Sequence, residues 1–171
     1  MFYGFLLGVV TSTLAIYLIL SSPVGDDGID YDGDGFPEEK WIYKAGRVSE
    51  TRIDRNYDGE YDDIIYYDIE GLLKHSKSDA DFDGFFETRT FYFHGKPLRE
   101  ETDFNQNGIV DLRSNYTYGV LENIEFIDED TGKIRKKQYF KLGKLISADF
   151  DSDGDGTFDV HYEYDRYEVS R

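Results

Sequence analysis

Five segments of the chain share one spacing of acidic and amide residues, D-x-[DN]-x-[DN]-G-x-x-[DE]. Alternate residues of a tight loop point their side-chain oxygens at one centre, and glycine at position 6 permits the sharp turn. Position 7 adds a backbone carbonyl oxygen, and the acid at position 9 closes the shell. Such a loop supplies the roughly six to eight oxygens that calcium accepts. The pattern therefore predicts about five bound calcium ions.

The predicted metal ligands fall into five loops, each named after its first residue. They are Asp30, Asp32, Asp34, Phe36 and Glu38; Asp54, Asn56, Asp58, Glu60 and Asp62; Asp79, Asp81, Asp83, Phe85 and Glu87; Asp103, Asn105, Asn107, Ile109 and Asp111; and Asp151, Asp153, Asp155, Thr157 and Asp159. The Asp103 loop has only two acidic ligands, so we expect it to bind calcium most weakly.

Other metals fit these loops less well than calcium. Magnesium takes fewer protein ligands in strict octahedral geometry. Zinc, copper and iron favour sulfur and imidazole ligands, whereas the chain has no Cys and its three His residues lie outside the loops. An alternative without any metal stays open, because Asp-Gly and Asn-Gly clusters are also typical of ordinary hairpin turns.

The overall charge favours one shared purpose for the loop acids. Positions 1, 3, 5 and 9 of the five loops carry as many acidic side chains as the formal net charge of −17. The other 19 acids balance the 19 Lys and Arg residues. Outside these ligand positions the chain is electrically neutral, and its acidity opposes nucleic acid or anionic lipid as a partner.

The loops are not EF-hands. An EF-hand needs a bidentate Glu at position 12, and the five residues there are Trp41, Ile65, Thr90, Ser114 and Tyr162. The loops instead resemble the Asp-rich loop of FG-GAP repeats in integrin-type propellers. This resemblance covers only the roughly nine-residue loop and implies a cation in the connection between two strands. The longer period and the FG and GAP signatures of those repeats are missing.

The loops recur with a fixed period. Their first residues are 24, 25 and 24 residues apart, and the last interval of 48 residues is twice the period. A sixth, degenerate copy is therefore expected near residue 128, where the chain reads Asp-Glu-Asp-Thr-Gly-Lys. It lacks the final acid, and Lys133, Arg135, Lys136 and Lys137 follow. We expect a plain hairpin turn without an ion at this position.

Between the loops, each repeat is expected to form two strands joined by a glycine turn. The turns centre on Gly46, Gly71, Gly95, Gly119 and Gly143, and the flanking runs are rich in aromatic and β-branched residues. The sequence thus predicts an all-β fold, an antiparallel meander of about six 24-residue β-hairpin repeats with the calcium loops along one edge. Its Tyr-x-x-Gly-x-Leu rhythm resembles MORN and RHS/YD repeats.

The first 20 residues carry no charge and are long enough to span a bilayer as one helix. We expect residues 1–20 to be an uncleaved transmembrane anchor, with a cleaved signal segment and secretion as the alternative. Residues 21–29 are predicted to be a linker and residues 30–171 the repeat domain. Calcium loops of extracellular modules bind weakly, at levels found outside the cytosol, so the repeat domain is expected to be periplasmic or extracellular.

No catalytic constellation stands out in the sequence. There is no nucleophile paired with a base and no glycine loop to hold phosphate, and the His residues are scattered. The leading hypothesis is a membrane-anchored, calcium-stabilised, non-catalytic module that presents a surface to a protein or glycan partner. An accessory subunit of a membrane complex, held through its N-terminal helix, is the alternative. A hydrolase that uses the sheet face is the third hypothesis.

Overall fold

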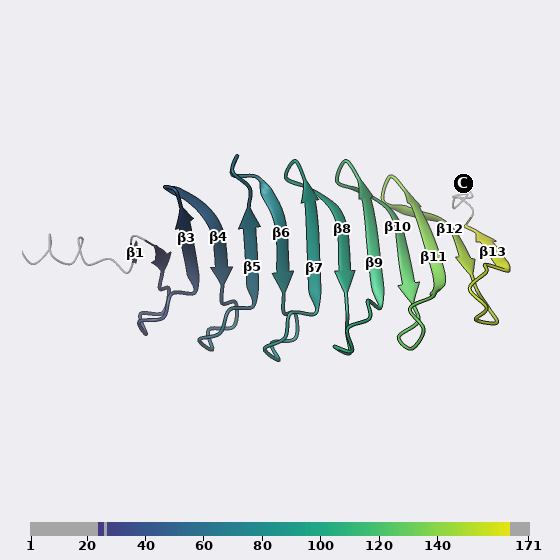
Figure 1. Ribbon diagram of the computed structural model, residues 1–171, viewed down its shortest axis with the longest axis horizontal. Coiled ribbons are helices and arrows are strands. Elements are labelled where there is room, and N and C mark those ends of the chain that lie inside the picture. Colours follow the sequence, from purple (N-terminus) through teal and green to yellow (C-terminus); the bar gives the residue numbers. More distant parts are fainter. Residues whose placement is uncertain (1–23, 26, 165–171) are drawn as a thin grey trace, which may run out of the picture.

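The computed structural model describes residues 24–25 and 27–164, which form one antiparallel sheet of 13 strands in sequence order. Each strand pairs with the next one along the chain, so the sheet is an uninterrupted meander (Figure 1). The predicted all-β, antiparallel meander is confirmed. The strands are β1 (Val24–Gly25), β2 (Gly28–Ile29), β3 (Glu39–Lys44), β4 (Arg47–Ile53), β5 (Asp63–Tyr67), β6 (Leu73–Ser78), β7 (Thr88–Phe93), β8 (Lys96–Thr102), β9 (Leu112–Thr117), β10 (Val120–Ile127), β11 (Ile134–Lys141), β12 (Lys144–Phe150) and β13 (Val160–Glu163).

Two kinds of connection alternate along the sheet. The Asp-rich loops all lie at one edge and the glycine turns at the other (Figure 1). Most glycine turns are two-residue connections, such as Ala45-Gly46 between β3 and β4, where the φ angles are 53° and 76°. Positive φ at both positions is typical of the type I′ turn, which matches the twist of paired strands.

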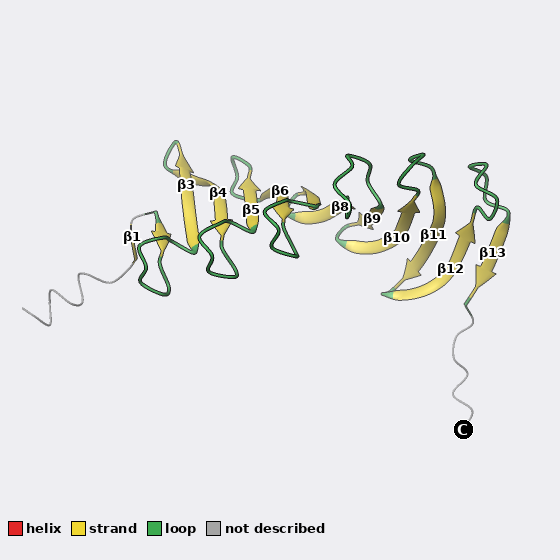
Figure 2. Ribbon diagram, turned by 90° about the horizontal axis from the view of Figure 1, so that it is seen from below, coloured by secondary structure: helices red, strands yellow, loops and turns green. Residues whose placement is uncertain are grey.

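The sheet is a single layer, and the strands follow one another in a curved line without a second layer (Figure 2). Among the described residues, Ala148 is the only fully buried apolar side chain. Small polar residues such as Thr51, Thr102 and Ser114 are buried instead, and tyrosine hydroxyls approach the buried Thr51 and the half-buried Ser76. The Tyr67 hydroxyl is 3.3 Å from Thr51 Oγ1, and the Tyr92 hydroxyl is 3.4 Å from Ser76 Oγ. The pairing of neighbouring strands, rather than a central core, holds the fold together.

The N-terminal region is described only in part. The predicted membrane segment, residues 1–20, lies outside the described residues. No helix within residues 24–25 and 27–164 is long and apolar enough to cross a membrane. The range 21–29, predicted to be a linker, contributes β1 and β2, and Gly28 pairs with Lys40 of β3. The sheet therefore begins before the first Asp-rich loop.

Candidate metal-binding loops

The five Asp-rich loops share one hydrogen-bonding scheme, which begins with the Asp at position 1. Its Oδ2 accepts a hydrogen bond from the N–H of the glycine at position 6 in every loop, at 2.8–2.9 Å. Its Oδ1 accepts from the N–H at position 4 in four loops. In the Asp103 loop that donor is Asn107 at position 5. The first Asp thus folds the loop back around its own carboxylate.

The acid at position 9 closes each loop. It accepts a hydrogen bond from the N–H at position 2, for example from Arg55 to Asp62 Oδ2 at 2.6 Å and from Ala80 to Glu87 Oε1 at 2.7 Å. The residues predicted at position 7 donate their N–H to the side chain at position 5, at 2.7–2.9 Å. A carboxylate oxygen has two lone pairs, so these bonds leave capacity for a further partner.

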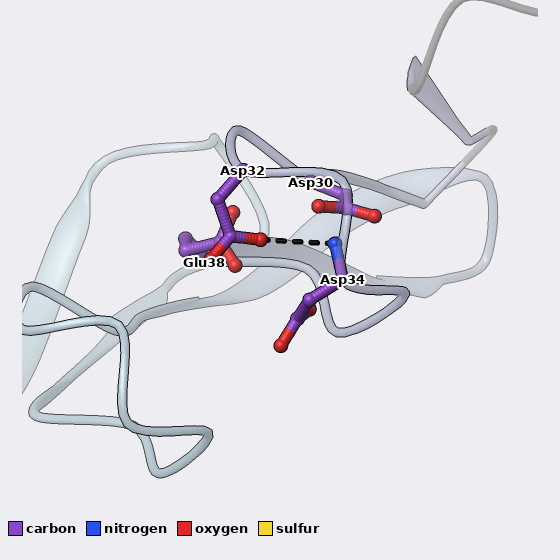
Figure 3. Close-up of side chains that lie close together, drawn as sticks. All are labelled: Asp30, Asp32, Asp34 and Glu38. Carbon is purple, nitrogen blue, oxygen red and sulfur yellow. Dashed lines mark hydrogen bonds between the residues drawn. The ribbon is translucent and has the colours of Figure 1, made fainter.

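Three loops bring acidic oxygens together closely enough for a cation. In each of them, carboxylate oxygens lie within 4.8 Å of one another. Figure 3 shows the most complete cluster, which comes entirely from the connection between β2 and β3. The clusters are Asp30, Asp32, Asp34 and Glu38; Asp79, Asp81 and Glu87; and Asp151, Asp153 and Asp155. The predicted ligands Asp83 and Asp159 stand apart from these clusters and accept hydrogen bonds from Gln106 and Ser152.

The other two loops carry Asn in place of some of the acids, and these amides form hydrogen bonds of their own. Asn56 in the Asp54 loop donates from Nδ2 to Asp58 Oδ2 at 2.8 Å. In the Asp103 loop, the amide groups of Asn105 and Asn107 turn toward Glu129 of the sixth turn. The Asn side chains that replace Asp at these positions have an NH2 group that can donate to a carboxylate or a carbonyl oxygen, whereas an ionised Asp can only accept.

The donor set fits a cation best in the Asp79 loop. Within the described part of the chain, Glu87 Oε2 is the one buried side-chain oxygen or nitrogen without a hydrogen-bond partner. Asp79 in the same cluster is only 2% exposed. Burying a carboxylate oxygen unpaired beside another carboxylate is costly. A hard divalent cation, which binds carboxylate oxygens, would remove that cost at this position.

Neighbouring loops also touch one another, which the sequence analysis did not anticipate. Arg55 forms an ion pair with Asp63 at 3.1 Å and places its guanidinium 5.0 Å from the ring of Phe82 in the next loop. Gln106 Nε2 donates to Asp83 Oδ2 at 2.7 Å. The contacts of Arg55 with Phe82 and of Gln106 with Asp83 join residues more than 20 positions apart, so only the repeat period indicates them in the sequence.

The sixth turn makes the most distinctive contact between loops. As expected, residues 128–133 form a hairpin turn between β10 and β11, in which Asp128 accepts from Thr131. Lys133 donates to the backbone oxygen of Asp155 at 3.0 Å. Although burial raises the pKa of Asp151, N–H groups of Gly156 and Gly154 and the charge of Arg135 outweigh it and lower that pKa overall. Lys133 and Arg135 therefore already place positive charge beside the Asp151 loop.

Comparison with known proteins gives no family for this chain. A scan of protein families finds no match, and a search of curated proteins finds none either. Among solved structures, the chain is similar to Staphylococcus aureus TarM (TM-score 0.46, 16% identity, 77% of this chain and 23% of that one). It is also similar to the pneumococcal O-GlcNAc transferase GtfA (TM-score 0.42, 14% identity, 83% and 25%). The chain spans about a quarter of either protein. Neither similarity is close enough to transfer a fold, an activity or a partner.

Proposed function

We propose that this protein is a membrane-anchored β-repeat module, stabilised by about five calcium ions, whose sheet presents a binding surface to a protein or glycan partner. One observation carries the metal assignment above the others. Carboxylate oxygens crowd within 4.8 Å of one another in three loops, and Glu87, a member of one of these clusters, has its Oε2 buried without a partner. Ordinary hairpin turns have no need for such crowding.

The proposed ions have a structural purpose. Each loop connects two paired strands of a sheet that has almost no apolar core, so the repulsion within each loop acts directly on strand pairing. A bound calcium ion supplies the positive charge that offsets this repulsion. Because each repeat contacts mainly its neighbours, the loss of one ion is expected to loosen the adjacent strand pairs before the rest of the sheet.

The loops are not expected to be equivalent. The Asp30, Asp79 and Asp151 loops present clustered carboxylates, so they are proposed as the stronger sites. The Asp54 and Asp103 loops carry amides in place of acids, and these amides donate to Asp58 of the same loop and to Glu129 of the sixth turn, so these two loops are proposed as the weaker sites. Weak, millimolar-range sites of this kind fill outside the cytosol, which supports a periplasmic or extracellular repeat domain behind the proposed anchor of residues 1–20.

The absence of catalysis is also part of the proposal. In the loops, the acids at positions 1 and 9 accept hydrogen bonds from backbone N–H groups. The fixed hydrogen-bonding scheme repeats from loop to loop, as is expected of a structural element rather than of one specialised active site.

Calorimetry or native mass spectrometry of the full chain in detergent tests the metal assignment. We expect about five calcium ions per chain, filled in two classes of affinity, and a melting temperature that falls on chelation and recovers with calcium. Magnesium at equal concentration is expected to restore much less. An unchanged melting curve after chelation would show that the loops are only turns.

A further inference from the structure

A row of directly paired residues crosses one face of the sheet from β3 to β13. Paired residues of an antiparallel sheet point to the same face, and the register links one residue from each of these strands. The row lies close to the edge that carries the Asp-rich loops. Its two halves differ sharply in charge.

The C-terminal half of the row alternates in sign. Its members are Glu101, Arg113, Glu125, Lys137, Asp149 and His161. Arg113 lies 3.2 Å from both Glu101 and Glu125, and Lys137 lies 2.9 Å from Glu125. Opposite charges across strands stabilise a sheet, so this half is satisfied within the molecule.

The N-terminal half of the row contains no acid. Its members are Lys40, Arg52, Ile64, Lys77 and Arg89, which we call the cationic strip. Lys40 is paired directly with Arg52, and Lys77 with Arg89. Like charges placed directly opposite destabilise a sheet. In a chain with a net charge of −17, this arrangement is unexpected for a purely structural surface.

Most cations of the strip also have no ion partner nearby. Arg52 pairs with Glu50 at 2.5 Å. Within the described part of the chain, Lys40, Lys77 and Arg89 form no ion pair at all. Arg89 stands opposite Glu101, but that carboxylate is engaged by Arg99 at 3.3 Å and by Arg113 at 3.2 Å.

The next row on the same face, on the side away from the Asp-rich loops, adds aromatic groups across β3 to β8, and Glu50 is its one acid there. It contains Tyr66, His75 and Phe91, which are two residues from members of the strip on β5, β6 and β7. The rings of Tyr66 and His75 stack at 4.3 Å, and the Arg99 guanidinium covers Phe91 at 4.9 Å. Burial lowers the pKa of His75, and Lys74 and Lys77 lower it further, as expected in a positive environment.

We propose that the cationic strip binds an anionic linear polysaccharide that lies across strands β3 to β7. This inference rests on the proposed function, because it names the chemistry of the partner. Neighbouring strands are about 4.8 Å apart, so the strip is a narrow track of positive charge about 20 Å long that suits a chain with negative groups at regular intervals. Filled calcium sites would offset the acidic loops beside it, which otherwise repel such a polymer.

Two other anionic partners fit this surface less well. A bilayer would contact the whole face, including the C-terminal half, where the side chain of Glu163 is 85% exposed. An acidic peptide is recognised either by pairing with a free strand edge or by a cluster of arginines. The strands β3 to β7 are each paired on both sides, and the two arginines of the strip lie on β4 and β7, which are not neighbours. A polysaccharide needs neither a wide cationic surface nor a free edge.

The test is a binding measurement on the full chain in detergent with calcium present. The probes are dextran sulfate and polygalacturonate, with neutral dextran, polyglutamate and phosphatidylglycerol vesicles as comparisons. The variant Lys77→Gln/Arg89→Gln removes two cations of the strip. Its control, Lys141→Gln/Lys144→Gln, removes two exposed, directly paired cations at the hairpin tip of β11 and β12.

We expect both anionic polysaccharides to bind, and the strip variant to bind them about fivefold or more weakly. The control variant should stay close to the unaltered chain, and added salt should weaken binding. Absent binding, or equal losses in the two variants, would overturn the inference. Strip-dependent binding that is as tight to polyglutamate or vesicles would reassign the partner. Polysaccharide binding could also be lost on chelation but unchanged in the Lys77→Gln/Arg89→Gln variant. That result would overturn the inference and indicate that calcium ions bridge the protein and the polysaccharide.

These outcomes are separable from the calcium proposal. A chain that binds calcium but no anionic polysaccharide would leave the proposed module intact and reject its proposed partner. A chain that binds the polysaccharide through the strip without any bound calcium would support the proposed partner and reject the calcium assignment.

Discussion

The Lys133 ammonium reaches from the sixth turn to the neighbouring Asp151 loop, where it lies 3.0 Å from the backbone oxygen of Asp155. The same ammonium lies 3.4 Å from the backbone oxygen of Gly154. The sixth turn lacks the final acid of the pattern, and it thus places a side-chain cation against the Asp151 loop, which has an acid at each of positions 1, 3, 5 and 9. Because of this contact, we expect the Asp151 loop to depend less on calcium than the Asp30 and Asp79 loops.

The variant Lys133→Gln tests this dependence. Without the ammonium, the Asp151 loop loses a nearby positive charge and should open more readily when calcium is chelated. We expect faster hydrogen exchange in residues 151–159 under chelation, and nearly normal exchange with calcium bound. Lys144→Gln removes an exposed lysine away from the loops and should change neither value.

The variant Glu87→Gln should have opposite effects with and without calcium. It keeps an oxygen that can accept the Ala80 N–H bond but removes the charge of the unpartnered oxygen. Under chelation, we expect the free energy of unfolding to rise by about 1 kcal/mol because repulsion is relieved. With calcium present it should fall, together with the loss of about one ion. Asp130→Asn in the sixth turn is the control, and it should change neither stoichiometry nor stability.

The Glu125 ion pairs predict a measurable acid dependence. Burial raises the pKa of Glu125, but Lys137 and Arg113 outweigh burial and lower that pKa overall. A lowered carboxyl pKa adds stability above the unfolded value of 4.5 and loses it as pH falls through the folded value. Glu125→Gln should therefore reduce the free energy of unfolding by about 1–2 kcal/mol at neutral pH. The difference from the unaltered chain should vanish in acid, as denaturant titrations over a pH series would reveal.

Nuclear magnetic resonance of His75 can report on the cationic strip directly. Because Lys77 contributes to the lowered pKa of His75, Lys77→Gln should move that pKa upward, toward its ordinary value. A bound anionic polysaccharide should move it in the same direction in the unaltered chain. Lys144→Gln is again the control, and a polysaccharide that leaves the His75 pKa unchanged would argue against binding at the strip.

The fourth residue of the Asp54 loop predicts a gain in stability. Tyr57 has a φ of 65°, a conformation that suits glycine, and the equivalent residue of the Asp30 loop is Gly33 with a φ of 81°. Tyr57→Gly should relieve strain and raise the free energy of unfolding by about 1 kcal/mol. Gly33→Ala should lower it by a similar amount. Thermal melting of both variants with calcium present decides the matter.

The features that depend on local spacing could be predicted from the sequence. The alternation of Asp-rich loops and glycine turns at a 24-residue period predicted the antiparallel meander and the separation of the two connections to opposite edges. It also located the sixth turn near residue 128. These features were predictable because turn geometry and strand alternation involve residues close together in the chain.

Contacts between residues far apart in the chain set which loops gather their carboxylates and how neighbouring repeats meet. The spacing pattern predicts Asp83 as a ligand equivalent to the others, yet its carboxylate accepts a hydrogen bond from Gln106 of the next loop. The cationic strip likewise emerges from strand register, including the β-bulge between Tyr66 and Tyr67. A shift of one residue would send Lys77 to the other face, so no local pattern reveals it. The repeat period brings these distant residues within reach, and the pairing register alone sets their contacts.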